Sequence, residues 1–96
     1  MQQYTLSSKA DDDIDDITDY TLEQWGENQT QLYIDGLLQC FQSLAHKPAL
    51  GHSAAVFAPH LQRYNYKAQA IFYEPTDKGI YIVRVLGQQR DFKRYL

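Results

Sequence analysis

The chain has 96 residues, 44% of them hydrophobic, and a formal net charge of −3, which suffices for one hydrophobic core and predicts a single domain over residues 1–96. Its one cysteine, Cys40, excludes an internal disulfide bond, and no apolar run approaches the roughly twenty residues that cross a bilayer. The first residues hold no apolar segment typical of a signal peptide, so we expect a cytoplasmic protein without membrane contact.

The charge is divided between two parts of the chain. Residues 1–40 contain nine acidic residues and one lysine, a net charge of −8, whereas residues 41–96 contain eight lysines and arginines and three acidic residues, a net charge of +5. This asymmetry predicts a polarised surface and bears on partners rather than on the fold. We expect the basic part to meet an acidic or anionic partner.

The amino-terminal part predicts a strand and then a helix. Residues 3–7, "QYTLS", form the predicted strand, and Ser8 is placed to cap a helix that begins near Lys9. Apolar residues recur through this helix at three- and four-residue spacing, before Gly26 ends it; they are Ala10, Ile14, Ile17, Thr21 and Trp25. The aspartates between them then lie mostly on the solvent side, as a solvated acidic face; they are Asp12, Asp13, Asp15, Asp16 and Asp19.

A second predicted helix begins after Asn28 and ends near Lys47, because Pro48 disfavours helical geometry at the residue before it. Its apolar stripe consists of Tyr33, Ile34, Leu37, Leu38, Phe41, Leu44 and Ala45. Only Glu27 and Asn28 separate the two helices, so we expect them to fold back on one another as an antiparallel hairpin.

The rest of the chain predicts a sheet. After a loop rich in Gly, Ser, Pro and His, the segment "LQRYNYKAQAIFY" predicts two strands that are separated near Lys67. The turn "EPTDKG" follows, and then "IYIVRVL", whose β-branched residues are typical of a central strand. The predicted fold class is α+β with the order β-α-α-β-β-β, in which an N-terminal helical hairpin packs on one face of a curved antiparallel sheet.

Alternation along the last strand assigns its residues to two faces. Tyr81, Val83 and Val85 lie on one face, and Ile80, Ile82, Arg84 and Leu86 lie on the other. An unpaired guanidinium beneath a helix layer costs on the order of several kcal/mol. We therefore expect the helices to cover the Tyr81 face and Arg84 to lie on an open face that displays positive charge.

No catalytic residue, metal site or cofactor is predicted. The acidic run "DDDIDD" lacks the Gly and Glu that an EF-hand loop requires at its sixth and twelfth positions. The spacings of His46, His52 and His60 match no zinc pattern, and Cys40 lies one residue off the apolar stripe, as a half-buried residue does. The sequence has no recognisable nucleophile with its base and no glycine-rich phosphate loop.

Six basic residues remain as candidate binding residues, with three tyrosines among them. They are Arg63, Lys67, Arg84, Arg90, Lys93 and Arg94, with Tyr64, Tyr66 and Tyr95. Cations interleaved with aromatic rings suit the phosphates and bases of nucleic acids. Arginines also cover sheet faces and pair with acidic helices, and composition alone leaves both interpretations open.

Two segments of the chain are "DIDDITDYTLEQWGENQTQLYIDGLLQCFQSLAHKPALG" and "RVLGQQRDFKRYL". These segments and the order of the elements resemble those of the ParE toxins of bacterial type II toxin–antitoxin modules, within the RelE/ParE superfamily. The resemblance covers almost the whole chain. Its most specific parts are Ile17, Tyr20, Trp25 and Gly26 in the first helix, Leu44, Ala45, Pro48 and Gly51 at the end of the second, and Arg84, Val85, Leu86, Asp91 and Arg94.

The resemblance implies a small cytoplasmic toxin that inhibits DNA gyrase by binding, catalyses nothing, and is neutralised by a ParD-like antitoxin, through which alone it contacts operator DNA. The implied target-binding residues are Arg63, Lys67, Arg84, Arg90, Lys93, Arg94 and Tyr95. Phe57, Tyr73 and Phe92, which the predicted core does not need, are the expected antitoxin-binding residues.

Two alternatives stay open. The RelE branch of the superfamily cleaves messenger RNA on the ribosome, and here Arg63, Lys67 and Tyr95 would serve that chemistry, although Gln89 stands where that branch has an arginine. The other alternative is a toxin-fold protein that acts mainly as antitoxin partner and co-repressor. The chain departs from the ParE pattern at Gly87, Arg90 and Tyr95, where the family usually has His, Met and His.

Overall fold

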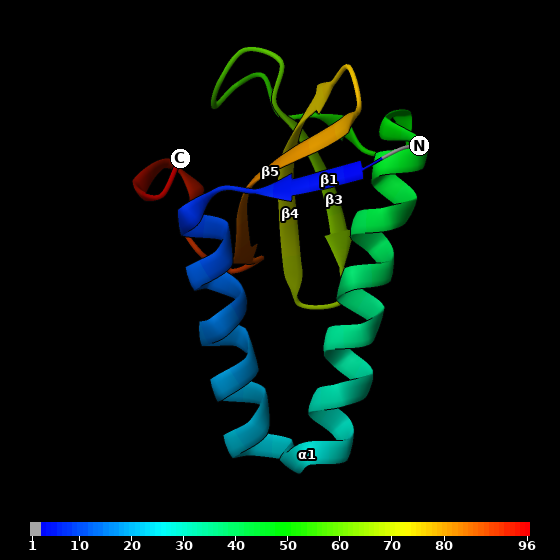
Figure 1. Cartoon of the computed structure of the whole chain (residues 1–96). Coiled ribbons are helices and arrows are strands. Elements are labelled where there is room, and N and C mark those ends of the chain that lie inside the picture. The colour runs from blue at the N-terminus through cyan, green and yellow to red at the C-terminus, as the bar shows by residue number, and fades with distance from the viewer. Residues whose placement is uncertain (1–2) are drawn as a thin grey trace.

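Figure 1 shows a computed structural model of the chain, which describes residues 3–96. In chain order its elements are β1 (Gln3–Leu6), α1 (Ser8–His46), the 3-10 helix η1 (Pro48–Leu50), β2 (His52–Ser53), β3 (Gln62–Tyr66), β4 (Gln69–Thr76), β5 (Gly79–Gly87) and the 3-10 helix η2 (Phe92–Arg94). The strands form one sheet in the order β1-β5-β4-β3-β2, and α1 packs on one face of it. The predicted α+β architecture is confirmed.

The element α1 is a helical hairpin. Its backbone is non-helical at Gly26, where φ is 82° and ψ is 178°. Residues 8–25 and 27–46 run in opposite directions on the two sides of this break (Figure 1). The sequence prediction of a hairpin that turns at Gly26 is therefore confirmed.

The two ends of α1 follow local sequence signals. Ser7 rather than Ser8 is the cap, and its Oγ accepts a 2.9 Å hydrogen bond from a main-chain N–H of the first turn. Lys47 caps the other end, directly before Pro48, as predicted. Trp25, which was expected on the buried stripe, is 69% exposed, because the tip of the hairpin extends past the ends of the strands (Figure 1).

The sheet is mixed rather than wholly antiparallel. The strands β3, β4 and β5 pair antiparallel, with turns at residues 67–68 and 77–78, where the sequence predicts them. The strand β1, however, pairs parallel with β5, from Gln3 opposite Gly79 to Leu6 opposite Ile82. Nothing local predicts this direction, because the chain reaches β5 from β1 only after the hairpin and three other strands.

The strand β5 contains a bulge at Val83. Its neighbours Ile82 and Arg84 pair with the consecutive residues Tyr73 and Phe72 of β4, so Val83 is the extra residue. An extra residue reverses the face toward which each following side chain points. Alternation along β5 therefore does not hold across this position.

The bulge changes the predicted assignment of faces. The helices cover Ile80 and Ile82, together with Val85 beyond the bulge, and the expectation that they cover the Tyr81 face is wrong, since Tyr81 is 38% exposed. The bulge places Arg84 opposite Phe72, whose ring belongs to the core on the other face. Its guanidinium nevertheless reaches Asp13 of α1, so the expectation that Arg84 is clear of the helices is wrong.

Each face of the sheet has its own core. The core beneath α1 consists of Ala10, Leu37, Phe41, Leu44, Ala45, Ile71, Tyr73, Ile80, Ile82 and Val85. The opposite core is smaller and consists of Ala54, Leu61, Ala70, Phe72 and Leu86. Phe57 and Ala58 of the loop before β3 pack on this second core, as do Phe92, Tyr95 and Leu96 near the C-terminus. The prediction of an open face is therefore wrong, because a loop and the C-terminal residues close it.

Candidate functional site

Arg84 joins the last strand to the acidic helix. Its Nε donates a 2.8 Å hydrogen bond to Asp13 Oδ2, and its Nη2 donates another of 2.8 Å to Asp13 Oδ1. The side chains of Arg84 and Asp13 are only 13% and 11% exposed. The hydrogen bond to Asp13 is the main cause that raises the pKa of Arg84. The expected display of this guanidinium on an open face is therefore wrong, because its charge is neutralised inside the protein.

The third nitrogen of Arg84 contacts the C-terminal segment, which we define as residues 88–96. Arg84 Nη1 donates a 2.9 Å hydrogen bond to the carbonyl of Tyr95, and the guanidinium carbon lies 5.7 Å from the centre of the Tyr95 ring. Arg90 lies 5.2 Å from the same ring centre, and its Nη1 donates a 3.1 Å hydrogen bond to the Tyr95 hydroxyl. The structure thus brings together three of the predicted target-binding residues.

The helix η2 presents two further cations of that set. The Asp91 side chain caps it by accepting a hydrogen bond from the Lys93 N–H, and the ring of Phe92 packs 5.0 Å from the ring of Phe72. Lys93 and Arg94 are exposed. The C-terminal segment is therefore anchored by an aromatic ring while it displays positive charge to solvent.

Arg63 and Lys67 contact the two different cores. The guanidinium of Arg63 lies 4.8 Å from the ring centre of Phe92, on the second core. The Nζ of Lys67 lies 5.6 Å and 5.5 Å from the rings of Tyr33 and Tyr66, and Tyr66 packs against the core beneath α1. The sequence grouped these two cations, and the structure separates their side chains.

Gln88 links the turn between β3 and β4 to the C-terminal segment. Its Nε2 donates a 2.6 Å hydrogen bond to the Lys67 carbonyl, and its main-chain N–H donates one of 2.9 Å to the Ala68 carbonyl. Its Oε1 accepts a longer hydrogen bond, 3.5 Å, from Arg63. Sequence reasoning missed Gln88, since a neutral residue after a strand carries no distinctive signal.

The residues expected to receive an antitoxin are not equivalent. Tyr73 is 0% exposed and belongs to the core beneath α1, so the premise that the core does not need it is wrong. Phe57 and Phe92 are half-buried on the second core, with ring centres 6.0 Å apart in an edge-to-face arrangement. Only the exposed edges of these two rings remain for a partner.

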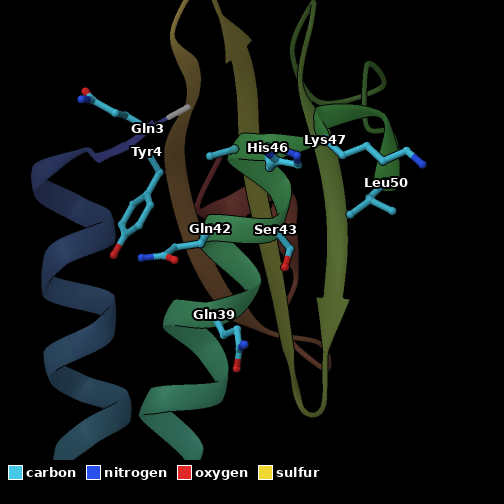
Figure 2. A pocket seen from close by; sticks show the side chains of 9 residues that line it. Gln3, Tyr4, Gln39, Gln42, Ser43, His46, Lys47 and Leu50 are labelled. Carbon is cyan, nitrogen blue, oxygen red and sulfur yellow. The ribbon is translucent and has the colours of Figure 1, made fainter. Parts of the chain in front are cut away.

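One surface hollow lies away from these cations. It has a volume of about 1110 Å³ and opens between β1 and the end of α1. Figure 2 shows Gln39, Gln42, Ser43 and His46 along one side of α1, with Tyr4 of β1 across from them. Amide, hydroxyl and imidazole side chains line it, but most of the lining surface is apolar, and no predicted site residue belongs to it.

A smaller hollow, of about 280 Å³, lies where the second half of α1 faces β3. Cys40, Tyr64 and Tyr66 line it, and burial raises the pKa of the Cys40 thiol. The thiol is therefore held neutral, as expected for a half-buried residue rather than a nucleophile.

Asp13 is the main residue that sequence reasoning missed. It was assigned to the solvated face with its neighbouring aspartates, yet it pairs with Arg84 and also accepts a 3.0 Å hydrogen bond from the Val85 N–H. A signal was present: Asp13 lies three residues after Ala10 and one before Ile14, at the edge of the apolar stripe. An acidic residue at that position faces the sheet rather than the solvent.

Two further properties hold for the part of the chain that the structure describes. Within residues 3–96 no three His, Cys, Asp or Glu side chains gather closely enough to hold a metal ion. Over the same residues, no helix combines the length and the apolar character that crossing a membrane requires.

The helical hairpin on a mixed sheet is a fold shared with a solved toxin–antitoxin structure. Residues 4–92 match the family described as ParE toxin of type II toxin-antitoxin system, parDE. The chain therefore belongs to the ParE toxin family, and the resemblance inferred from the sequence is confirmed.

Particular relatives agree with this assignment. The chain is 30% identical over 95 residues to Toxin ParE1 of Mycobacterium tuberculosis, and the aligned region covers 98% of this chain and 97% of the relative. It is 28% identical over 96 residues to Toxin ParE1 of Caulobacter vibrioides, covering 100% and 99%. A solved structure described as the chromosomal ParDE TA system from P. aeruginosa matches with a TM-score of 0.76 at 17% identity, over 91% of this chain and 96% of that one, which supports the fold.

The three positions at which we expect departures from the ParE pattern, Gly87, Arg90 and Tyr95, lie in one contact group. The main-chain N–H of Arg90 donates a 3.0 Å hydrogen bond to the carbonyl of Gly87, and the Arg90 side chain contacts Tyr95. These departures therefore change one local surface rather than three separate ones.

Proposed function

We propose that this chain inhibits DNA gyrase by binding, without catalysing a reaction, and that a ParD-like antitoxin neutralises it. The observation that carries the proposal is its membership of the ParE family over residues 4–92. The implied activity of that family, given above from the sequence resemblance, is gyrase inhibition. The exposed cations of the C-terminal segment supply a physical means of engaging such a target.

The proposed target surface is the C-terminal segment, with Arg90, Lys93 and Arg94 as its main cations. These three residues are exposed. Arg84 and Arg63 have partners within the protein, so they would support the segment rather than meet the target first. A gyrase complex with cleaved DNA offers phosphates, and cations that neutralise phosphates make binding strong and dependent on salt.

The antitoxin partner is proposed on the relation to parDE systems. Its contacts would include the exposed edges of Phe57 and Phe92, and operator DNA would be bound only through the antitoxin. This surface borders the cationic segment, because Phe92 is the first residue of η2. An antitoxin placed there would cover part of the proposed target surface, which offers a direct means of neutralisation.

The ribonuclease alternative has less support. The residues it requires are Arg63, Lys67 and Tyr95, and their functional groups contact different partners: Phe92, the rings of Tyr33 and Tyr66, and Arg90 respectively. A catalytic cluster needs its groups directed at one reacting phosphate. Gln89 supplies no cation in place of the missing arginine.

Gyrase supercoiling with purified components tests the proposal. The wild-type chain should inhibit it, and the triple variant Arg90→Ala, Lys93→Ala, Arg94→Ala should require at least about tenfold more protein, since each phosphate contact adds to affinity. A matched control removes the same charge from exposed lysines elsewhere, with Lys9→Ala, Lys47→Ala and Lys78→Ala. Equal loss in both variants would show that net charge, not the segment, matters.

A second measurement separates the alternatives. A wild-type chain that leaves supercoiling unchanged but cleaves messenger RNA on programmed ribosomes would overturn the proposal in favour of the ribonuclease. A chain that does neither, yet forms a stable complex with an antitoxin encoded beside it and represses their promoter, would favour the partner and co-repressor alternative. In the proposed case the triple variant still forms the complex with that antitoxin, through the contacts at Phe57 and Phe92.

A further inference from the structure

Asp13 stands at one end of a bonded path that crosses from the acidic helix to the basic segment. Its two carboxylate oxygens accept from Arg84, and Oδ2 also accepts from the main-chain N–H of Val85. The aspartates around it are exposed, namely Asp11, Asp12, Asp15 and Asp16. Only Asp13 in this run is committed to a partner in the sheet.

The path continues from Arg84 into the C-terminal segment. Two nitrogens of Arg84 bind the carboxylate, and the third, Nη1, binds the carbonyl of Tyr95 at 2.9 Å. The guanidinium is planar and rigid, so two fixed bonds on one edge determine where the remaining N–H groups point. Asp13 therefore sets the direction in which Arg84 holds Tyr95.

Tyr95 in turn holds Arg90. The hydroxyl of Tyr95 accepts from Arg90 Nη1 at 3.1 Å, and the arginine lies over the ring. The other anchor of the segment is Phe92, packed against Phe72 and beneath Arg63. Loss of the path from Asp13 would thus leave the segment attached at Phe92 and free the part that carries Arg90.

We propose that Asp13 is a positioning residue for target binding, which acts through Arg84 and Tyr95 to hold Arg90 in its binding geometry. This inference rests on the proposed function, because it assumes that the C-terminal segment meets the target. Groups that are ordered before binding lose less conformational entropy on association, so removing this order weakens binding without removing any contact residue.

The test uses Asp13→Asn in the full chain. The amide keeps an oxygen for the Val85 N–H but removes the ion pair. The variant should need about five- to tenfold more protein for equal gyrase inhibition, the effect of freeing one or two side chains at an interface. Asp12→Asn, an exposed neighbour, is the matched control and should match the wild type.

Coupling distinguishes positioning from a purely structural role. In an Arg90→Ala background, Asp13→Asn should weaken inhibition by less than about twofold, since its effect passes through the residue already removed. A structural role would lower inhibition by the same factor in both backgrounds, and that result would overturn the proposal.

A readout independent of gyrase keeps the two proposals separate. The N–H groups of Tyr95 and Leu96, which donate to the Phe92 carbonyl, should exchange hydrogen at least about threefold faster in Asp13→Asn, while core amides of β4 are unchanged. Unchanged exchange at residues 95 and 96 would overturn the positioning role. Faster exchange with a wild-type chain that never inhibits gyrase would overturn the proposed function alone.

A second variant covers the case in which Asp13→Asn does not fold. Arg84→Lys keeps a charge beside Asp13 but has no second nitrogen to reach Tyr95. It should show the same faster exchange at Tyr95 and Leu96. Wild-type exchange in this variant would overturn the proposed path.

Discussion

The hydroxyl of Tyr73 accepts a 3.0 Å hydrogen bond from the N–H of Gly51 and thereby ties β4 to the chain that follows α1. The same hydroxyl donates a 2.6 Å hydrogen bond to the carbonyl of Pro48. The backbone of Gly51 passes so close that a Cβ at residue 51 would overlap the hydroxyl oxygen. A residue expected at a partner surface instead fixes η1 against the sheet.

Tyr73→Phe should lower the free energy of unfolding by about 2 kcal/mol, because two hydrogen bonds are lost and their half-buried main-chain partners are left unpaired. Urea denaturation measures the change. Tyr81→Phe, at a side chain that is 38% exposed, is the control and should change stability by no more than about 0.5 kcal/mol. Equal effects of the two variants would mean that these hydrogen bonds add nothing.

Alkaline titration should show Tyr73 ionising late. Burial raises its pKa above the ordinary 10.0, and the hydrogen bond from Gly51 opposes this only in part. Above pH 10.0 the Tyr73 hydroxyl therefore keeps its proton in the folded chain at pH values where the unfolded chain releases it. The contribution of the protonated hydroxyl to the free energy of unfolding is complete below pH 10.0 and is lost as the pH rises through the higher pKa of the folded chain. Phenolate absorbance, compared between wild type and Tyr73→Phe, should differ only near or above the pH of unfolding.

Gly26→Ala should destabilise the hairpin by about 1 to 3 kcal/mol, because φ of 82° with ψ of 178° is a region open almost only to glycine. No atom lies within 4 Å of an added Cβ there, so the cost comes from the backbone and not from a clash. Thermal or urea unfolding measures it. Gly87→Ala, whose Cβ would meet its nearest atom at 3.8 Å, is the control and should be close to neutral; a neutral Gly26→Ala would contradict the conformational argument.

Arg84→Ala should lower the free energy of unfolding by about 3 kcal/mol, since it strands the mostly buried carboxylate of Asp13. The exposed Arg94→Ala should change it by no more than about 0.5 kcal/mol. In a double-mutant cycle measured by denaturation, Asp13→Asn should cost much less after Arg84→Ala than before it. Additive losses would mean that the two side chains do not interact in solution.

Cys40 should react slowly with iodoacetamide, because burial raises the pKa of its thiol above 9.0 and only the thiolate reacts. The rate, followed by mass spectrometry, should rise with pH later in the folded chain than in the same chain in urea. Since the folded pKa is the higher one, the neutral thiol favours the folded state below pH 9.0, and this advantage is lost above it. Identical pH profiles in the two states would show that the thiol is not shielded.

Much of the fold could be predicted because its signals are local. Gly26 and Pro48 mark the turn and the end of the hairpin through the backbone geometry that each permits. The turns at residues 67–68 and 77–78 follow from breaks between β-branched and aromatic runs. These features depend on a few neighbouring residues, so no knowledge of distant contacts is required.

The candidate site was less predictable because its connections are distant in sequence. The sequence indicated a group of cations at the C-terminal end, and the structure places both Arg84 and Arg90 in contact with Tyr95. It also offered the pairing of arginines with the acidic helix as an alternative, and that pairing holds for Arg84 with Asp13. The choice of Asp13 among several aspartates needed the register of helix against strand.

Local sequence signals were enough to predict the order of β1, the helical hairpin and β3, β4 and β5, the turn of the hairpin, and a non-edge position for β5. They also indicated the family and the concentration of positive charge near the C-terminus, but they missed β2. Only the tertiary structure decided the parallel direction of β1, the bulge at Val83, the closure of the second face, and the partner of Arg84. Residues 13 and 84 are 71 positions apart, and such pairs are selected by the packing of the whole chain, because backbone propensities act only over the few residues of one turn or strand.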